Sequence, residues 1–217
     1  TKKFIEWVKK YDPDVIHIHN IHGYYINVEI LFDYLKTCGK KIIWTLHDCW
    51  ALTGHTPYCD TVNCKKWQSG CLKCPLKREY PRTFFDRSTK NWNKKKEMFF
   101  GVCNMTVVVP SEWLKKRVNE SYLTEYPTMV IHNGIDTNKF TPKEGNFRII
   151  NTLYGKIIIL GVATSWDENK GINDFIEISK RLDSNYRVVL IGLSDSQVKK
   201  IPKNIIGIKR TNSIDEL

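Results

Sequence analysis

Short runs of apolar, mostly β-branched residues recur along the chain, with polar stretches between them. The runs are continuous rather than alternating, which is typical of strands buried on both faces of a parallel sheet. The predicted strands span residues 15–18, 42–46, 105–109, 129–131, 157–162, 188–191 and 205–208.

Helical periodicity fills several of the stretches between these runs. Val28, Leu31, Phe32 and Leu35 follow the i, i+3, i+4, i+7 spacing of a helix with one apolar face, and a similar spacing runs over 172–182. Strands that alternate with helices predict an α/β fold of Rossmann-like, doubly wound parallel sheets.

Two segments interrupt the alternation. Residues 49–81 show neither the apolar run of a strand nor the apolar spacing of a helix, and they are rich in Cys, Gly, Pro and Lys. They are therefore predicted to be an insertion that is functional or held together by internal cross-links. Residues 141–155 are polar and separate two groups of strands. We therefore expect a domain at 1–145, which carries the insertion, and a second domain at 146–217.

Composition narrows the class of protein. With 217 residues, 41% hydrophobic and 26% charged, the chain has the balance of a globular protein. No apolar run approaches the length of a membrane span. The net charge of +11 predicts an anionic partner, namely nucleic acid, a membrane surface or a phosphorylated substrate.

Five of the seven cysteines lie between Cys49 and Cys74. Such clustering in an odd-numbered set favours a reducing compartment, and hence a cytoplasmic protein, over a secreted disulfide scaffold. Four thiolates suit a structural, tetrahedral zinc ion, for which His55 is an alternative ligand. Two disulfides or four independent thiols are the other interpretations. The proposed zinc ligands are Cys59, Cys64, Cys71 and Cys74.

Polar residues follow two neighbouring predicted strands. His22 comes after the first, and His47 and Asp48 end the next. Ligands of open α/β sheets bind beyond the carboxyl ends of the strands, so these residues are placed as site residues. Farther along, the turn after 157–162 leads to Lys170 and Gly171 at the start of a helix, where amide groups and a lysine favour a phosphate.

The combination of motifs resembles glycosyltransferase family 4, the retaining nucleotide-sugar enzymes of GT-B fold, and most of all its bacterial capsular, O-antigen and colanic-acid members. The motifs that carry the resemblance are PDVIHIHN at 13–20, WTLHDCW at 44–50, TGH at 53–55, CLKCP at 71–75, VPSEWL at 109–114, VIHNGID at 130–136 and KG at 170–171.

This resemblance implies transfer of a sugar from a nucleotide diphosphate-sugar to a glycan acceptor, often lipid-linked, without a catalytic metal. It implies a catalytic role for His47 with Asp48, and a donor-phosphate role for Lys170 with Gly171. Ser165 stands near where such enzymes usually place an arginine. The acceptor-side residues that it implies are Asn20, His22, Asn133 and Gly134.

Family members are about twice a typical domain in length, so the resemblance also implies a piece truncated at both ends. The missing parts are expected to be the first strand with its glycine-rich loop and the Glu-x7-Glu segment. The second domain is then incomplete, and the fragment alone is expected to be inactive.

Phe85, Trp92 and Phe99 lie seven residues apart, with lysines between them. The spacing predicts an amphipathic basic helix that either lies on an anionic membrane or turns its aromatic side chains to the core. We favour the core for the aromatic residues. Peripheral attachment to the inner membrane face remains the alternative.

Three other functions are weighed against glycosyl transfer. A basic, zinc-containing nucleic-acid module is disfavoured, because the basic residues are scattered and no recognition helix follows the cysteines. A nucleotide-sugar epimerase would need a dinucleotide glycine fingerprint, which the sequence lacks. A non-catalytic remnant of a glycosyltransferase stays open.

Overall fold

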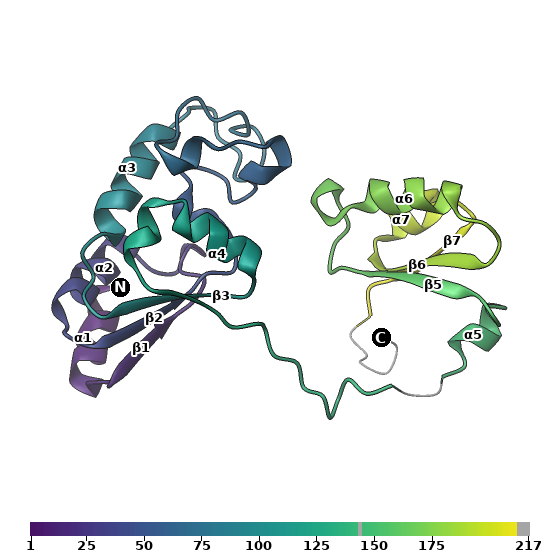
Figure 1. Ribbon diagram of the computed structural model, residues 1–217, viewed down its shortest axis with the longest axis horizontal. Helices are drawn as coiled ribbons and strands as arrows, with labels where there is room; N and C mark the ends of the chain where they lie inside the picture. Colours follow the sequence, from purple (N-terminus) through teal and green to yellow (C-terminus); the bar gives the residue numbers. More distant parts are fainter. Residues whose placement is uncertain (143–144, 212–217) are drawn as a thin grey trace. The chain divides into compact units, whose positions relative to one another are not determined.

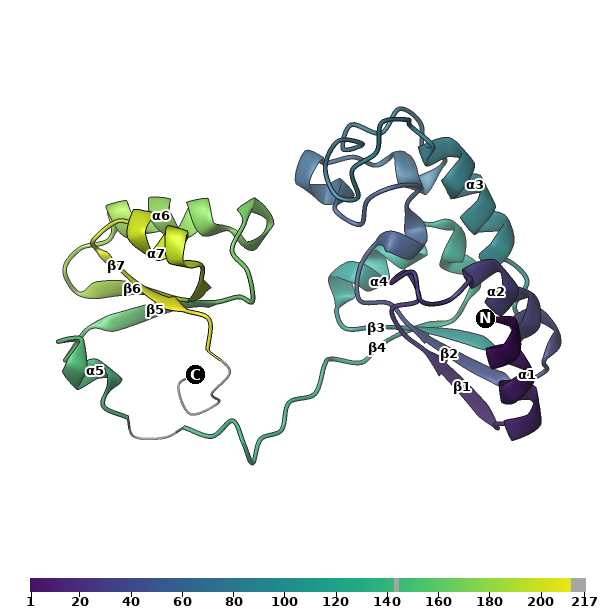
Figure 2. The same cartoon turned by 180° about the vertical axis from the view of Figure 1, so that it is seen from behind.

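The computed structural model describes residues 1–142 and 145–211 and divides into two compact units, Thr1–Gly134 and Ile135–Leu217. The division falls after Gly134, ahead of the polar segment 141–155 in which the sequence analysis sets the boundary. Figures 1 and 2 show one parallel α/β sheet with its helices in each unit. In the part of the chain that the structure describes, no helix is long and apolar enough to cross a membrane.

The first unit is built on a four-stranded sheet with strand order β1-β2-β3-β4, and all neighbouring pairs are parallel. The four strands predicted in this part of the chain are confirmed. The strands are β1 (Val15–Ile18), β2 (Lys41–Thr45), β3 (Met105–Val109) and β4 (Thr128–Val130). The helices are α1 (Lys2–Tyr11), α2 (Val28–Thr37), α3 (Ser88–Phe99) and α4 (Glu112–Asn119).

Three aromatic side chains join α2, β2 and α3 in the core of this unit. Phe32, Trp44 and Phe99 are each at most 1% exposed, and their ring centroids lie 4.6 to 5.2 Å apart. Burying rings of this size contributes the largest apolar areas in the unit. The apolar stripe predicted for the helix around Leu31 therefore packs as expected, with Asn27 capping α2 through its side chain.

The segment 49–81, all of which the structure describes, contains no α-helix and no strand, as predicted. Its regular elements are three short 3-10 helices, η1 (Trp50–Leu52), η2 (Cys59–Val62) and η3 (Lys66–Gln68). The indole N–H of Trp92 on α3 donates to the carbonyl of Trp67, 2.9 Å away. The hydroxyl of Tyr122, on η4 (Tyr122–Glu125), donates to the carbonyl of Ala51. The insertion is thus tied to the rest of the unit near its start, at Ala51, and near its middle, at Trp67.

The second unit has a three-stranded parallel sheet with strand order β5-β6-β7. Its strands, β5 (Ile157–Val162), β6 (Tyr186–Leu193) and β7 (Ile205–Lys209), confirm the remaining three predicted strands. The helical segments are α5 (Phe147–Ile150), η5 (Glu168–Lys170), α6 (Ile172–Arg181) and α7 (Asp195–Lys200). Figures 1 and 2 show α6 and α7 on one face of this sheet.

The expectation that every strand is buried on both faces is wrong for the edge strands β1, β4 and β5. Leu160 is 50% and Val162 is 56% exposed, whereas the last six residues of β6 are all buried. The difference follows from position, because β5 lies at the edge of the described sheet and β6 lies at its centre. A continuous apolar run therefore predicts the position of the strand correctly, but it does not predict how exposed the side chains of the strand are.

Candidate functional site

The first candidate site lies where β1 and β2 end. Ile18 pairs with Trp44 across the two parallel strands, so the loops that follow them leave the sheet side by side. These loops carry the predicted residues Asn20, His22 and His47. A pocket at this edge is lined by His19, Asn20, Ile21, His22, Trp44, Thr45, Leu46, His47, Asp48, Trp50 and Ala51.

Three histidines lie in contact along this edge. His19 Nδ1 is 3.0 Å from His47 Nε2, and His17 Nε2 is 2.8 Å from the hydroxyl of Thr45. The centroids of the His17 and His19 rings are 4.2 Å apart. A hydrogen bond between two imidazoles needs one ring to donate and the other to accept, so it cannot survive protonation of both. Burial, followed by the nearby charge of His19, lowers the pKa of His17.

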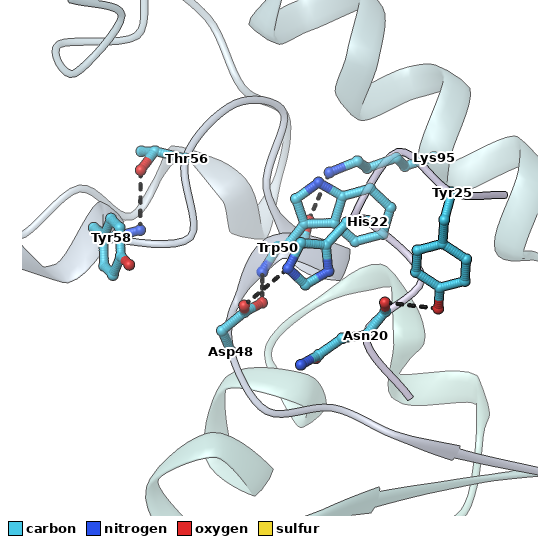
Figure 3. Close-up of polar contacts among 8 residues, drawn as sticks. All are labelled: Asn20, His22, Tyr25, Asp48, Trp50, Thr56, Tyr58 and Lys95. Atoms are coloured by element: carbon cyan, nitrogen blue, oxygen red, sulfur yellow. Dashed lines mark hydrogen bonds and ion pairs between the residues drawn. The ribbon is translucent and has the colours of Figure 1, made fainter. Parts of the chain in front are cut away.

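His22 and Asp48 lie in contact, with His22 Nε2 3.3 Å from Asp48 Oδ2 (Figure 3). The other carboxylate oxygen of Asp48 accepts a hydrogen bond of 2.7 Å from the backbone N–H of Trp50. The His22 and Trp50 rings stack at 4.9 Å between centroids. A carboxylate that orients an imidazole is the arrangement that general acid–base chemistry uses. The sequence predicts His22 and Asp48 separately, and the structure brings them together.

Asn20 lies in the loop after β1 with an exposed side chain. Its backbone carbonyl accepts a hydrogen bond of 2.9 Å from the hydroxyl of Tyr25, as Figure 3 shows. His47 is also exposed. Both side chains are therefore accessible to a ligand at the edge of the sheet.

Asn133 and Gly134 are exposed and follow β4, outside the group of residues that lines the His47 pocket. His132, directly before Asn133, contacts the carbonyl of Pro110 through Nδ1 at 2.8 Å. The structure therefore does not bring Asn133 and Gly134 together with the other predicted acceptor-side residues of the first unit.

The predicted phosphate-binding residues belong to the second unit. Lys170 ends η5 and is exposed, and Gly171 is the N-cap of α6 with a φ of 72°. The side chain of Asp167 caps this turn by accepting from the N–H of Lys170 at 3.0 Å. Ser165 lines a separate pocket of about 440 Å³ after β5, β6 and β7, which Lys170 does not line. That pocket also includes Ser194, Gln197 and Arg210.

The four predicted zinc ligands line one further pocket in the insertion, together with His55. All seven cysteines are free thiols. Burial raises the pKa of Cys71 to about 11, and its sulfur accepts a hydrogen bond from the N–H of Gly54 at 3.3 Å. Within residues 1–142 and 145–211, no group of three or more His, Cys, Asp or Glu side chains is arranged to hold a metal ion. The cysteines are thus neighbours without forming a ready metal site.

The basic helix α3 turns Trp92 and Phe99 inward, so the favoured interpretation is confirmed for these two residues and is wrong for Phe85. Trp92 is 6% and Phe99 is 0% exposed, while Phe85 precedes the helix and is 77% exposed. Lys95 is also buried, and its ammonium group lies 3.7 Å from the centroid of the Trp50 ring. The sequence predicts an amphipathic helix with its lysines on the polar face, and for Lys95 this prediction is wrong.

Three site residues were not selected from the sequence. His19 is marked only by its alternation with His17, and Trp50 only by its place after Asp48. Arg210 has no sequence signal apart from its position directly after β7. Each of them is placed in its pocket by the strand next to it.

Comparison with known proteins gives one family match. The model of the family described as Glycosyltransferase Family 4 matches residues 1–139. The Escherichia coli (strain K12) protein WcaC, whose name assigns it to colanic acid biosynthesis as a glycosyl transferase, is 30% identical over 134 residues. The alignment covers 57% of this chain and 32% of WcaC, so the chain spans about a third of the length of that relative.

Two solved structures resemble nearly the whole chain. Anabaena Alr3699/HepE in complex with UDP has 12% sequence identity and a TM-score of 0.57, covering 96% of this chain and 51% of that one. Sucrose-phosphate synthase (tll1590) from Thermosynechococcus elongatus has 15% identity and a TM-score of 0.59, covering 97% and 49%. At these identities the likeness shows the fold alone, and it confirms the predicted Rossmann-like, GT-B class.

Proposed function

The chain belongs to glycosyltransferase family 4, and we propose that it moves a sugar from a nucleotide diphosphate-sugar to a glycan acceptor in bacterial surface polysaccharide synthesis. One observation carries this proposal. His22, His47 and Asp48 line a single pocket at the carboxyl ends of two parallel strands, within the residues that match the family. Such an edge is where α/β enzymes bind their ligands.

The proposed donor is a nucleotide diphosphate-sugar. The structure of HepE, a fold neighbour, is described in complexes with UDP and with UDP-glucose. In the second unit, the exposed Lys170 stands directly before α6, and Ser165 and Arg210 share a pocket. We assign Lys170, Gly171 and Ser165 to the donor diphosphate, because a lysine beside helix amides stabilises the negative charge that develops on the leaving group. No catalytic metal is part of this proposal.

The proposed transfer retains the anomeric configuration, with His47 at the transfer centre. Asp48 orients the imidazole of His22, and His22 and Asn20 face the acceptor, a role that the family resemblance extends to Asn133 and Gly134. The geometry of the pocket supports this assignment of roles. His47 is exposed at the edge of the pocket, while Asp48 is held by two contacts.

We propose a lipid-linked acceptor at the cytoplasmic side of the membrane. The net charge of +11 supports contact with anionic lipid, and free thiols at all seven cysteines fit a reducing compartment. The aromatic side chains of α3 do not contribute to this contact, because Trp92 and Phe99 are buried.

We also propose that the insertion holds a structural zinc ion through Cys59, Cys64, Cys71 and Cys74. The support is that these four thiols line one pocket in a segment with only 3-10 turns. Thiolates at a closed tetrahedral site suit zinc. Binding would draw the four sulfur atoms closer together than they are here, with release of their protons.

The function is tested with purified protein and a panel of UDP- and GDP-sugars, with binding followed by saturation-transfer NMR. We expect one nucleotide diphosphate-sugar to bind and Lys170→Ala to weaken that binding. Lys180→Ala is the matched control, because Lys180 lies at the far end of α6 and pairs with Glu177. Transfer to a lipid-linked glycan, with the anomer of the product assigned by NMR, tests retention. Binding of no donor, or an inverted product, contradicts the corresponding part of the proposal.

Zinc is measured separately by elemental analysis of protein purified without added metal. We expect about one zinc ion per chain, lost in Cys71→Ser and in Cys74→Ser. Cys103→Ser is the control, since Cys103 is exposed and lies outside the insertion. A zinc-free, folded wild-type protein that takes up no added zinc rejects this assignment.

A further inference from the structure

A charged side chain lies buried beneath the first candidate site. Lys95, on α3, is 8% exposed and lies on the same helical face as Trp92 and Phe99. Its ammonium donates hydrogen bonds to the carbonyls of Trp50, at 2.6 Å, and Thr53, at 2.9 Å. Burying an ammonium is costly, and a methionine or leucine of similar length would fill the space without that cost. The presence of lysine here therefore calls for a role that an apolar side chain cannot perform.

Trp50 links Lys95 to the site. The Lys95 ammonium lies 3.7 Å from the centroid of the Trp50 ring, which stacks on the His22 ring. The backbone N–H of the same tryptophan donates to Asp48, and Asp48 pairs with His22. Lys95 thus contacts both the backbone and the ring of Trp50, a residue that touches both His22 and Asp48 (Figure 3).

The two carbonyls that Lys95 binds belong to the turn directly after Asp48. Trp50 begins the 3-10 helix η1, and Thr53 is the residue that follows it. The backbone bond that closes this turn, from Thr53 N to Trp50 O, is long at 3.4 Å. The two hydrogen bonds that Lys95 donates are shorter, at 2.6 and 2.9 Å, so they determine where the turn holds the indole ring.

We propose that Lys95 is a positioning residue, which fixes the turn at Trp50 and thereby holds the indole ring against His22 and the His22–Asp48 pair in its working geometry. This inference rests on the proposed glycosyl transfer for its effect on rate, but its structural content is independent of that function. The other titratable or charged groups that act on Lys95 are Asp48, Cys71 and His55.

The test compares Lys95→Met, Lys95→Arg and the control Lys94→Met in the full chain. Lys94 is the neighbouring lysine on α3, with an exposed ion pair to Glu29. The first measurement is the side-chain NMR signal of His22, assigned by its loss in His22→Gln. We expect this signal to move in Lys95→Met, because the indole ring leaves its stacked position. It should stay in place in Lys94→Met and return towards the wild-type position in Lys95→Arg, since a guanidinium also donates to carbonyls and stacks on tryptophan.

The second measurement is transfer by the same variants. A displaced pair should lower kcat by about 10- to 100-fold with little change in the KM for the donor. A folded Lys95→Met with an unmoved His22 signal, or with a moved signal and an unchanged kcat, overturns the inference.

If Lys95→Met does not fold, Trp50→Leu takes its place, because it removes the ring and leaves both backbone carbonyls. If wild type binds no donor, the proposed function fails. If it binds a donor but gives no transfer, as the family resemblance implies for the fragment alone, the His22 signal still decides whether Lys95 positions the pair.

Discussion

His19 Nδ1 lies 3.0 Å from His47 Nε2, so a hydrogen bond between two imidazole rings joins the loops after β1 and β2 at the edge of the candidate site. The bond fixes the orientation of an otherwise exposed His47 side chain. His19 is thus the structural partner of the residue that the family resemblance places at the transfer centre.

Replacement of His47 is expected to have the largest effect on transfer. His47→Ala should lower kcat by about 100-fold or more, which is the usual contribution of a positioned acid, base or polarising group. His19→Phe keeps a flat ring and removes the hydrogen bond, so it should cost about 10-fold. Lys41→Ala, at the opposite end of β2, is the control. Full activity of a folded His47→Ala protein would remove His47 from the mechanism.

The stability of the protein should depend on the protonation of Lys95. Burial lowers the pKa of Lys95 to about 7 from its usual 10.5. Between these values the unfolded chain binds a proton that the folded chain has released, so stability rises with pH across this window. The rise between pH 7 and pH 9 is expected to be about 2 to 3 kcal/mol.

The measurement is urea unfolding of wild type and Lys95→Met at several pH values, with the difference between the two proteins plotted against pH. Burial raises the pKa of Cys71 to about 11 and lowers that of His55 below its usual 6.5, so both titrate largely outside the window. Asp48 is the remaining group that acts on Lys95, and it is present in both proteins. A flat difference curve from pH 7 to pH 9 contradicts the prediction.

The strands could be predicted from sequence because a parallel sheet imposes continuous apolar runs, and β1, β3 and β5 have the predicted bounds. The interior of the insertion could not be predicted. Its shape depends on single long-range contacts, such as the hydrogen bond from Trp92 to the carbonyl of Trp67, which leave no period in the sequence.

The site was predictable in part for a similar reason. Strand ends identify His22, His47 and Asp48, but the pairing of His19 with His47 depends on the register of β1 against β2. Lys95 shares the helical spacing of Trp92 and Phe99, which signals burial. Its side-chain type signals exposure, because lysine is rarely buried. In the structure Lys95 is buried, and its side-chain nitrogen contacts two carbonyls and an indole ring.

Cysteine accessibility gives a direct test of the fold of the insertion. Cys103 is exposed, whereas Cys49, directly after Asp48, is 2% exposed. Under native conditions, iodoacetamide should label Cys103 first and Cys49 only after denaturant is added, with the sites identified by peptide mass spectrometry. Early labelling of Cys49 would show that the segment after β2 is not packed as described.

Gly54 occupies a place where no side chain fits. A Cβ atom at this position would lie 2.0 Å from the carbonyl oxygen of Ser88 and 3.0 Å from the Cβ of Cys71, and the first of these is backbone that cannot rotate away. Gly54→Ala must therefore separate the insertion from the start of α3, at an expected cost of about 1 to 3 kcal/mol or more in the free energy of unfolding. Gly134→Ala is the matched control, because nothing lies within 4 Å of its added Cβ. Urea unfolding of the two variants measures the difference. Equal stability of Gly54→Ala and Gly134→Ala would mean that the insertion does not pack against α3 through this contact.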